Sequence, residues 1–122
     1  MKSILVVEDS RAAFEILRRT LLASGKYSAD YFCRNGDNLM AMYEQHRPDL
    51  VVMDIVLEGT DGIDLTRDLM KIHPEARVVM ITSLSYQEVY DSAMAAGALG
   101  FITKPYRPEQ VISAFDRALA SP

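Results

Sequence analysis

The chain alternates between short continuous apolar runs and longer stretches in which apolar residues recur every three or four positions. Three runs hold four apolar residues each, at 4–7, 50–53 and 78–81. Each run contains two valines, and the other residues are leucine, isoleucine or methionine. Continuous runs of this length are typical of strands in a parallel sheet that is buried on both faces. The aromatic-rich segment 27–33 and the short apolar segment 99–103 are two further strand candidates.

Apolar residues at helical spacing predict helices between these strands. Three of the helices are indicated by the positions Phe14, Leu17 and Leu21, then Leu65, Leu69 and Ile72, and finally Val111, Phe115 and Ala118. Another helix is expected over residues 36–46. Ser85 and Glu88 have capping-box spacing, which predicts a helix start there, and Gly97 is expected to end that helix. Pro108 suits the first position of the last helix.

Five successive strand–helix units predict an α/β fold, with a parallel sheet covered by helices on both faces. Right-handed crossovers leave few topologies, and we predict a flavodoxin-like doubly wound five-stranded sheet with strand order 2-1-3-4-5. Because no linker or repeat interrupts the pattern, residues 1–122 are expected to form one domain. Ligands of such sheets bind beyond the carboxyl ends of the strands.

Composition narrows the classes of function. The 17 acidic and 13 basic side chains argue against direct binding of nucleic acid through a broad basic face. A single cysteine, Cys33, excludes an internal disulfide and a cysteine-based zinc cluster. No apolar run approaches the roughly 18 residues of a membrane span, and acidic residues follow the first run, unlike a signal peptide. We therefore expect a cytoplasmic protein that does not bind a membrane.

Polar side chains follow four of the predicted strands, at the point where each strand ends. These residues are Glu8 and Asp9, then Asp54, then Thr82 and Ser83, and finally Lys104. In a parallel sheet all of these strand ends meet at one edge. Each residue alone has an ordinary explanation, such as a helix cap for Asp9, a solvated position for Glu8, a turn for Thr82 or a surface loop for Lys104. Their coincidence at one edge predicts a functional site.

The chemistry of this set points to phosphoryl transfer. Three neighbouring carboxylates repel one another unless a cation offsets their charge, and Mg²⁺ prefers oxygen ligands of this kind. A lysine ammonium and a hydroxyl group can both bind phosphoryl oxygens. One carboxylate can then act as a nucleophile and form an aspartyl-phosphate.

The same segments resemble the receiver domain of bacterial two-component response regulators, over essentially the whole chain. The matching motifs are Ile4–Asp9, Val52–Ile55 followed by Asp61-Gly62, Val79–Ser83, Ala96–Ala98 and Phe101–Pro105. The resemblance implies a signalling switch rather than an enzyme with a separate substrate. It also implies a phosphodonor, which is a sensor histidine kinase or a histidine phosphotransfer protein.

The resemblance assigns a role to each site residue. Asp54 is the phosphoacceptor, and the ligands of Mg²⁺ (or Mn²⁺) are Glu8, Asp9, Asp54 and the main-chain carbonyl of Val56. Thr82 is the switch hydroxyl and Phe101 the aromatic switch residue. Lys104 pairs with the phosphoryl group, and the Lys104-Pro105 bond is expected to be cis.

Several positions depart from the common pattern of the family. Glu58 stands where proline is frequent, Ser83 where alanine or glycine is frequent, and Phe101 lacks the hydroxyl of the tyrosine often found there. Val56 and Leu84 occupy the two positions whose side chains flank the phosphoryl group in the family. Both are apolar and cannot orient an attacking water, so we expect slow self-dephosphorylation.

Tyr86 and Tyr90 form a stripe on the helix that precedes Gly97, and two interpretations are open. The tyrosines either cap the core with their hydroxyls in water or contribute to a partner surface, which Tyr106 would join. In the family this face responds to phosphorylation. Its expected partners are a downstream protein or an output domain, and a phosphorylation-dependent homodimer is a further option.

Three alternatives differ in class from a phosphorylated switch. A haloacid-dehalogenase-like phosphatase requires a second aspartate two residues after its nucleophile, where this chain has Val56. A flavin or nucleotide site requires a glycine-rich loop after the first strand, where Glu8 and Asp9 would repel a phosphate. A receiver-like adaptor that works without phosphorylation would not need Asp9, Asp54 and Lys104 together.

Overall fold

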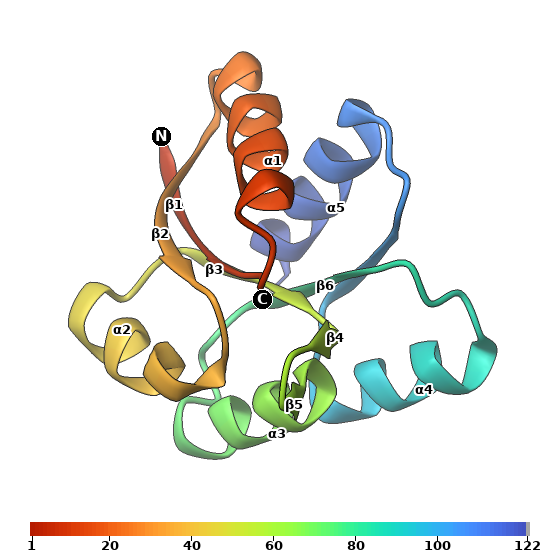
Figure 1. The fold of residues 1–122 in the computed structure, drawn as a ribbon. Helices are drawn as coiled ribbons and strands as arrows, with labels where there is room; N and C mark the ends of the chain where they lie inside the picture. Colours follow the sequence, from red (N-terminus) through yellow and green to blue (C-terminus); the bar gives the residue numbers. More distant parts are fainter. Residues whose placement is uncertain (122) are drawn as a thin grey trace.

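Five parallel strands form one sheet, in the order β2-β1-β3-β6-β7 (Figure 1). The computed structural model describes residues 1–121. The strands are β1 (Lys2–Val7), β2 (Tyr27–Cys33), β3 (Leu50–Asp54), β6 (Val78–Thr82) and β7 (Gly100–Thr103). Since β6 and β7 are the fourth and fifth of the predicted strands, the predicted order 2-1-3-4-5 is confirmed.

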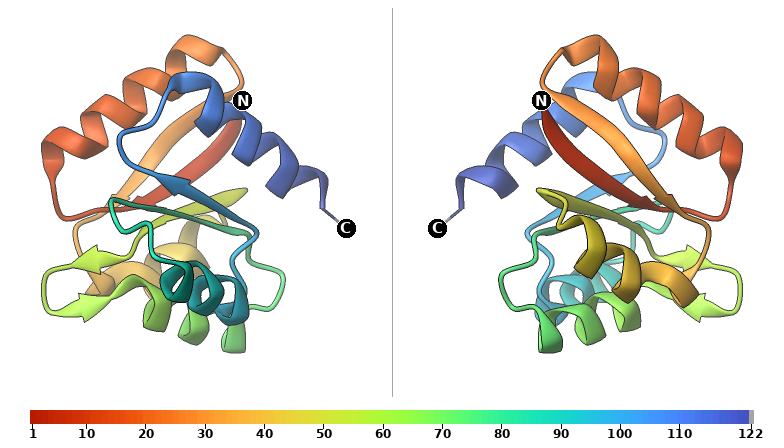
Figure 2. Two further views of the ribbon diagram at one scale, coloured as in Figure 1. Left: turned by 90° about the vertical axis from the view of Figure 1, so that its right-hand side faces the viewer. Right: turned by 90° about the vertical axis from the view of Figure 1, so that its left-hand side faces the viewer.

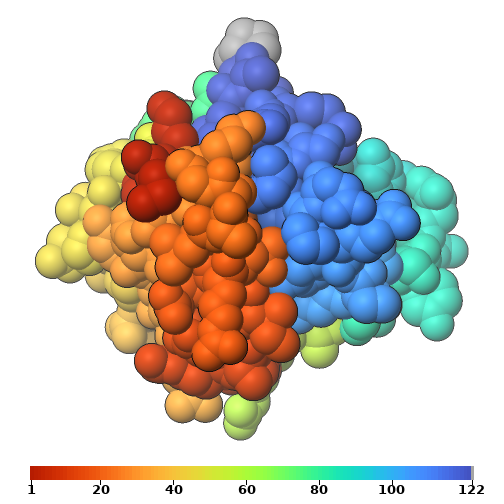
Figure 3. All heavy atoms as spheres, turned by 90° about the horizontal axis from the view of Figure 1, so that it is seen from above, coloured from red at the N-terminus to blue at the C-terminus, as the bar shows by residue number. Residues whose placement is uncertain are grey.

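Helices cover both faces of the sheet, as the flavodoxin-like prediction required (Figures 1 and 2). They are α1 (Arg11–Ser24), α2 (Leu39–His46), α3 (Gly62–Ile72), α4 (Gln87–Ala96) and α5 (Pro108–Ala120). Helices α1 and α5 lie on one face, and Figure 3 shows them side by side at the surface. Helices α2, α3 and α4 lie on the other face. None of the helices among the described residues is long and apolar enough to cross a membrane.

The core consists of two apolar layers, one on each side of the sheet. Successive residues of a strand point to opposite faces. Leu5 and Val7 of β1 therefore pack in the layer beneath α2, α3 and α4, whereas Ile4 and Val6 pack in the layer beneath α1 and α5. Every residue of β3 and β6 is buried. This two-sided burial explains why the central strands read as continuous apolar runs.

The helix starts show where local prediction succeeds and where it fails. Ser10 caps α1, because its hydroxyl accepts a hydrogen bond from the Ala13 N–H at 3.1 Å, and this leaves Asp9 outside the cap. The capping box predicted at Ser85 is wrong, because α4 begins at Gln87 after an extended Tyr86 at the N-cap. The helix predicted over 36–46 opens with a 3₁₀ turn, η1 (Gly36–Asn38), before α2.

A short hairpin after β3 was not predicted. Its strands are β4 (Val56–Leu57) and β5 (Thr60–Asp61), which pair in antiparallel fashion. Glu58 and Gly59 form the two-residue turn between them, and Gly59 has a φ of 75°. The hairpin lies just past the carboxyl end of β3, and its turn therefore stands next to the edge at which the candidate site was expected (Figure 2).

Candidate functional site

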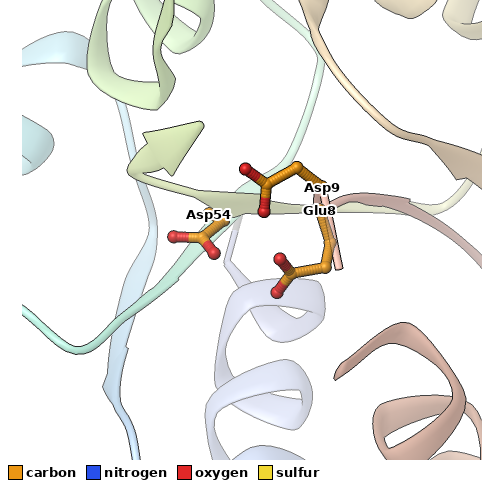
Figure 4. Close-up of side chains that lie close together, drawn as sticks. All are labelled: Glu8, Asp9 and Asp54. Atoms are coloured by element: carbon orange, nitrogen blue, oxygen red, sulfur yellow. The ribbon is translucent and has the colours of Figure 1, made fainter. Parts of the chain in front are cut away.

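Three carboxylates meet at the carboxyl ends of β1 and β3 (Figure 4). Glu8 and Asp9 follow β1, Asp54 ends β3, and one carboxylate oxygen of each lies within 4.8 Å of the others. Glu8 is only 4% exposed and Asp54 only 6% exposed. Glu8 is therefore not a solvated edge residue, and the predicted meeting of the three side chains is confirmed.

Lys104 reaches this cluster from the loop that follows β7. Its ammonium Nζ lies 2.9 Å from Glu8 Oε1 and 3.2 Å from Asp54 Oδ2. Lys104 is thus an ion-paired member of the site rather than a surface loop residue. One ammonium against three carboxylates leaves the cluster with an excess of two negative charges when all four groups are ionised.

The buried charged groups of the site shift one another's pKa values. Burial raises the pKa of Asp54 to about 6; the Lys104 charge works against this rise and the Glu8 charge adds to it. Burial disfavours the ammonium of Lys104, but the hydrogen bond to Glu8 and the charges of both carboxylates outweigh it and raise the pKa of Lys104. The site therefore keeps its lysine charged, and a further cation would favour ionised Asp54.

Each carboxylate also accepts one hydrogen bond from a main-chain N–H. Such bonds hold the carboxylates in place before any ligand arrives. The donors are Val56 to Asp54 Oδ1 at 3.1 Å, Ser10 to Glu8 Oε2 at 3.2 Å and Glu58 to Asp9 Oδ2 at 3.2 Å.

Thr82 is the last residue of β6 and is fully buried. Its hydroxyl oxygen accepts a hydrogen bond from the Leu84 N–H at 3.2 Å. Its carbonyl accepts one from the Lys104 N–H at 2.7 Å, which ties the ends of β6 and β7 together. The Lys104-Pro105 peptide bond is cis, as the resemblance implied. A main-chain hydrogen bond thus connects Thr82 directly to Lys104.

The aromatic residues divide between the two faces of the sheet. Tyr86 is 67% exposed and Tyr90 is 42% exposed, and the Tyr90 ring packs edge-on against Phe101 with centroids 5.4 Å apart. Tyr106 instead packs with the apolar layer beneath α1 and α5, where it lines a cavity together with Ile16. The Tyr106 ring thus lies on the side of the sheet covered by α1 and α5, and its joining Tyr86 and Tyr90 in one partner surface stays a prediction.

The two positions expected to influence the lifetime of an aspartyl-phosphate lie beside the site. The Val56 side chain is 55% exposed, and its N–H binds the Asp54 carboxylate. Leu84 is half-buried, and its N–H binds the Thr82 hydroxyl. Sequence reasoning missed two other contacts, namely the Glu8–Lys104 ion pair and the hydrogen bond from Glu58 to Asp9. Gly59, a residue type common in turns, was the available signal for the second.

Comparison with known proteins indicates one family for this chain. The sequence model of the response regulator receiver domain matches residues 4–116. The chemotaxis protein CheY of Halobacterium salinarum is 34% identical over 120 residues, which cover 98% of each chain. CheY of Thermotoga maritima is 30% identical over 116 residues, which cover 95% of this chain and 96% of that protein.

The same relationship holds for solved structures. A two-component response regulator of the LuxR family from Aurantimonas sp. superimposes with a TM-score of 0.93 at 28% identity, over 98% of this chain and 86% of that one. The family match thus extends over almost the whole sheet and includes Glu8, Asp9, Asp54, Thr82 and Lys104. The chain belongs to the response regulator receiver domain family of two-component systems.

Proposed function

We propose that Asp54 accepts a phosphoryl group from the phosphohistidine of a sensor histidine kinase or a histidine phosphotransfer protein. The observation that carries this proposal is the grouping of three carboxylates with Lys104 at one end of the sheet. Asp54 is nearly buried and contacts the Lys104 ammonium, and it pairs with Ile81, the residue that precedes Thr82 in the neighbouring strand. The lysine ammonium and the threonine hydroxyl can both bind a phosphoryl group. Phosphoryl transfer needs mainly such positioning and charge neutralisation.

The donor set fits a hard divalent cation. Glu8, Asp9 and Asp54 offer only carboxylate oxygens within 4.8 Å of one another, and the Val56 carbonyl lies two residues beyond Asp54. Oxygen-only ligands suit Mg²⁺ or Mn²⁺ and are poor ligands for softer metals. When bound, the cation supplies positive charge that offsets the negative charge of the transferring phosphoryl group.

The transfer exchanges one bond to phosphorus for another. An oxygen of the Asp54 carboxylate attacks the phosphorus, and the new O–P bond forms as the P–N bond of phosphohistidine breaks. The electron pair of that bond stays on the imidazole nitrogen, and the product on this chain is an acyl phosphate. Lys104, which already contacts Asp54 Oδ2 at 3.2 Å, is placed to bind an oxygen of the new phosphoryl group.

Phosphorylation changes a partner-binding surface formed by α4 and β7. The Thr82 hydroxyl donates a hydrogen bond to the phosphoryl group, and its movement changes the packing of Phe101 against Tyr90. The exposed side chains of Tyr86, which precedes α4, and Tyr90, within α4, then contact a downstream protein, an output domain or a second copy of the chain. Aromatic side chains of this kind are enriched where partners bind tightly.

Intact mass spectrometry tests the acceptor. Incubation with acetyl phosphate and Mg²⁺ should add one phosphoryl group, about 80 Da, to Asp54. Asp54→Asn, or EDTA in place of Mg²⁺, should abolish this gain. A folded protein that gains no mass with acetyl phosphate or with a phosphorylated histidine phosphotransfer protein would refute the proposal and favour an adaptor that works without phosphorylation.

Hydrogen exchange tests the switch. Phosphorylation should change the exchange rates of α4 and β7 in the wild type and leave α2, on the far side of the same layer, unchanged. The acetyl phosphate treatment should have no such effect on Asp54→Asn. If the exchange rates changed equally in α2 and α4, or in neither, phosphorylation would not act on the surface of α4 and β7 as proposed.

A further inference from the structure

The tip of the β4–β5 hairpin contacts the acidic site through one hydrogen bond. The main-chain N–H of Glu58 donates to Asp9 Oδ2 at 3.2 Å. Lys104 pairs with Glu8 and Asp54 but not with Asp9, and Asp9 is also the most exposed of the three acids. Within residues 1–121, the Glu58 N–H is the one hydrogen-bond donor found for the Asp9 carboxylate.

We propose that the main-chain N–H of Glu58 positions the Asp9 carboxylate for the divalent cation. This inference rests on the proposed function, because it assumes that Asp9 is a ligand of that cation. A half-exposed aspartate without a partner samples several side-chain conformations, and binding a cation would require it to adopt one. A donor that holds Oδ2 beforehand reduces this cost, in the way that hydrogen-bond partners support metal ligands elsewhere.

The hairpin can hold this N–H because it is anchored at both ends. Leu57 is 6% exposed and belongs to the apolar layer beneath α2, α3 and α4. Asp61 caps α3, since its carboxylate accepts a hydrogen bond from the Ile63 N–H at 2.7 Å. Between these anchors only Glu58 and Gly59 form the turn, so the Glu58 N–H has little freedom to move.

The geometry of the turn allows the Glu58 N–H to be removed by a substitution that keeps the turn. Gly59 has a φ of 75°, whereas Glu58 has a negative φ. A negative φ followed by a positive φ is the type II pattern, in which proline is common at the first of the two positions. Glu58→Pro should therefore fit the turn while it removes the N–H that binds Asp9.

Glu58→Ala is the matched control for Glu58→Pro. Both variants lose the Glu58 carboxylate, and with it the same nearby negative charge, but only proline lacks the N–H. Mn²⁺ binding is measured on the unphosphorylated protein by electron paramagnetic resonance, with Mg²⁺ as competitor. The Mn²⁺ dissociation constant of Glu58→Pro should be roughly tenfold higher than that of Glu58→Ala. The difference should vanish when both changes are made in an Asp9→Ala background.

Three results distinguish failure of the positioning role from failure of the proposed cation site. Equal Mn²⁺ affinity in Glu58→Pro and Glu58→Ala would refute the positioning role, and tighter binding by Glu58→Pro would show that the N–H competes with the cation. A folded wild type that binds no Mn²⁺ would instead refute the proposed cation site, and the positioning role would fall with it. Urea unfolding of each variant shows whether the Glu58→Pro protein is folded.

A second pair of variants covers the case in which Glu58→Pro does not fold. Gly59 and Gly25 have φ values of 75° and 72°, and a Cβ on either would meet nothing within 4 Å. Gly59→Val and Gly25→Val should therefore introduce similar backbone strain, but only the first disturbs the turn that carries the Glu58 N–H. Gly59→Val should weaken Mn²⁺ binding and Gly25→Val should not. Equal affinity in these two variants would refute the inference.

Discussion

Replacing Asp54 with asparagine is expected to stabilise the protein when no divalent cation is present. Burial raises the pKa of Asp54 from 3.8 to about 6, despite the attraction of Lys104. The folded state therefore disfavours the ionised carboxylate relative to the unfolded chain. At about 1.4 kcal/mol for each tenfold change in acidity, the penalty at neutral pH is about 3 kcal/mol. Asparagine removes this charge at every pH.

The sign of the pH dependence follows from the raised pKa. The stability associated with protonated Asp54 is fully present below pH 3.8 and is lost as the pH rises through about 6. The wild type should thus lose stability relative to Asp54→Asn over this range. The difference between the two proteins should be about 3 kcal/mol at pH 7.5 and about 1 kcal/mol at pH 4.5.

Urea unfolding in EDTA at both pH values measures this difference. Asp68→Asn, at an exposed position of α3, is the control and should match the wild type at both. Saturating Mg²⁺ should stabilise the wild type more than Asp54→Asn and so narrow the gap. An Asp54→Asn protein that is less stable than the wild type at pH 7.5 would show that the ion pair with Lys104 outweighs burial, and the reasoning would be refuted.

Three further predictions concern the surroundings of the site and the core. Val56→Asn combined with Leu84→Glu should speed loss of the phosphoryl group, because polar side chains there can orient a water; an unchanged rate of mass loss would contradict this. Gly62→Ala should cost about 1–3 kcal/mol in urea unfolding, because its Cβ would lie 2.0 Å from the Asp54 carbonyl oxygen. Burial raises the pKa of the Cys33 thiol to about 11, so iodoacetamide at pH 8 should label the folded protein about 100-fold more slowly than the unfolded protein; equal labelling rates would show that the thiol is not buried in solution.

The sheet could be predicted because its pattern is local. Every residue of β3 and β6 is buried, so each appears in the sequence as a continuous apolar run. The polar residues directly after these strands had to lie at one edge in a parallel arrangement. Asp54 and Thr82 were predicted from that rule alone, and the structure places both where it indicated.

Other features lay beyond local patterns. The two-residue strands β4 and β5 are too short to show a periodicity, so the hairpin and the Glu58 contact with Asp9 were missed. Ser85 has the right spacing for a capping box, but the loop after β6 remains extended through Tyr86. The sequence neighbourhood of Tyr106 did not reveal on which face of the sheet its ring packs.

The sequence by itself determined the five strands of the parallel sheet and their order, the approximate positions of the five helices, and the residue types at the strand ends. Only the tertiary structure decided that Lys104 lies between Glu8 and Asp54, and that both carboxylates are nearly buried. Glu8 and Lys104 are 96 positions apart, and their distance depends on how β1, β3, β6 and β7 align within the sheet. Periodicity reports which face of an element is buried, whereas distances between charges, and therefore pKa values, arise only when the elements pack together.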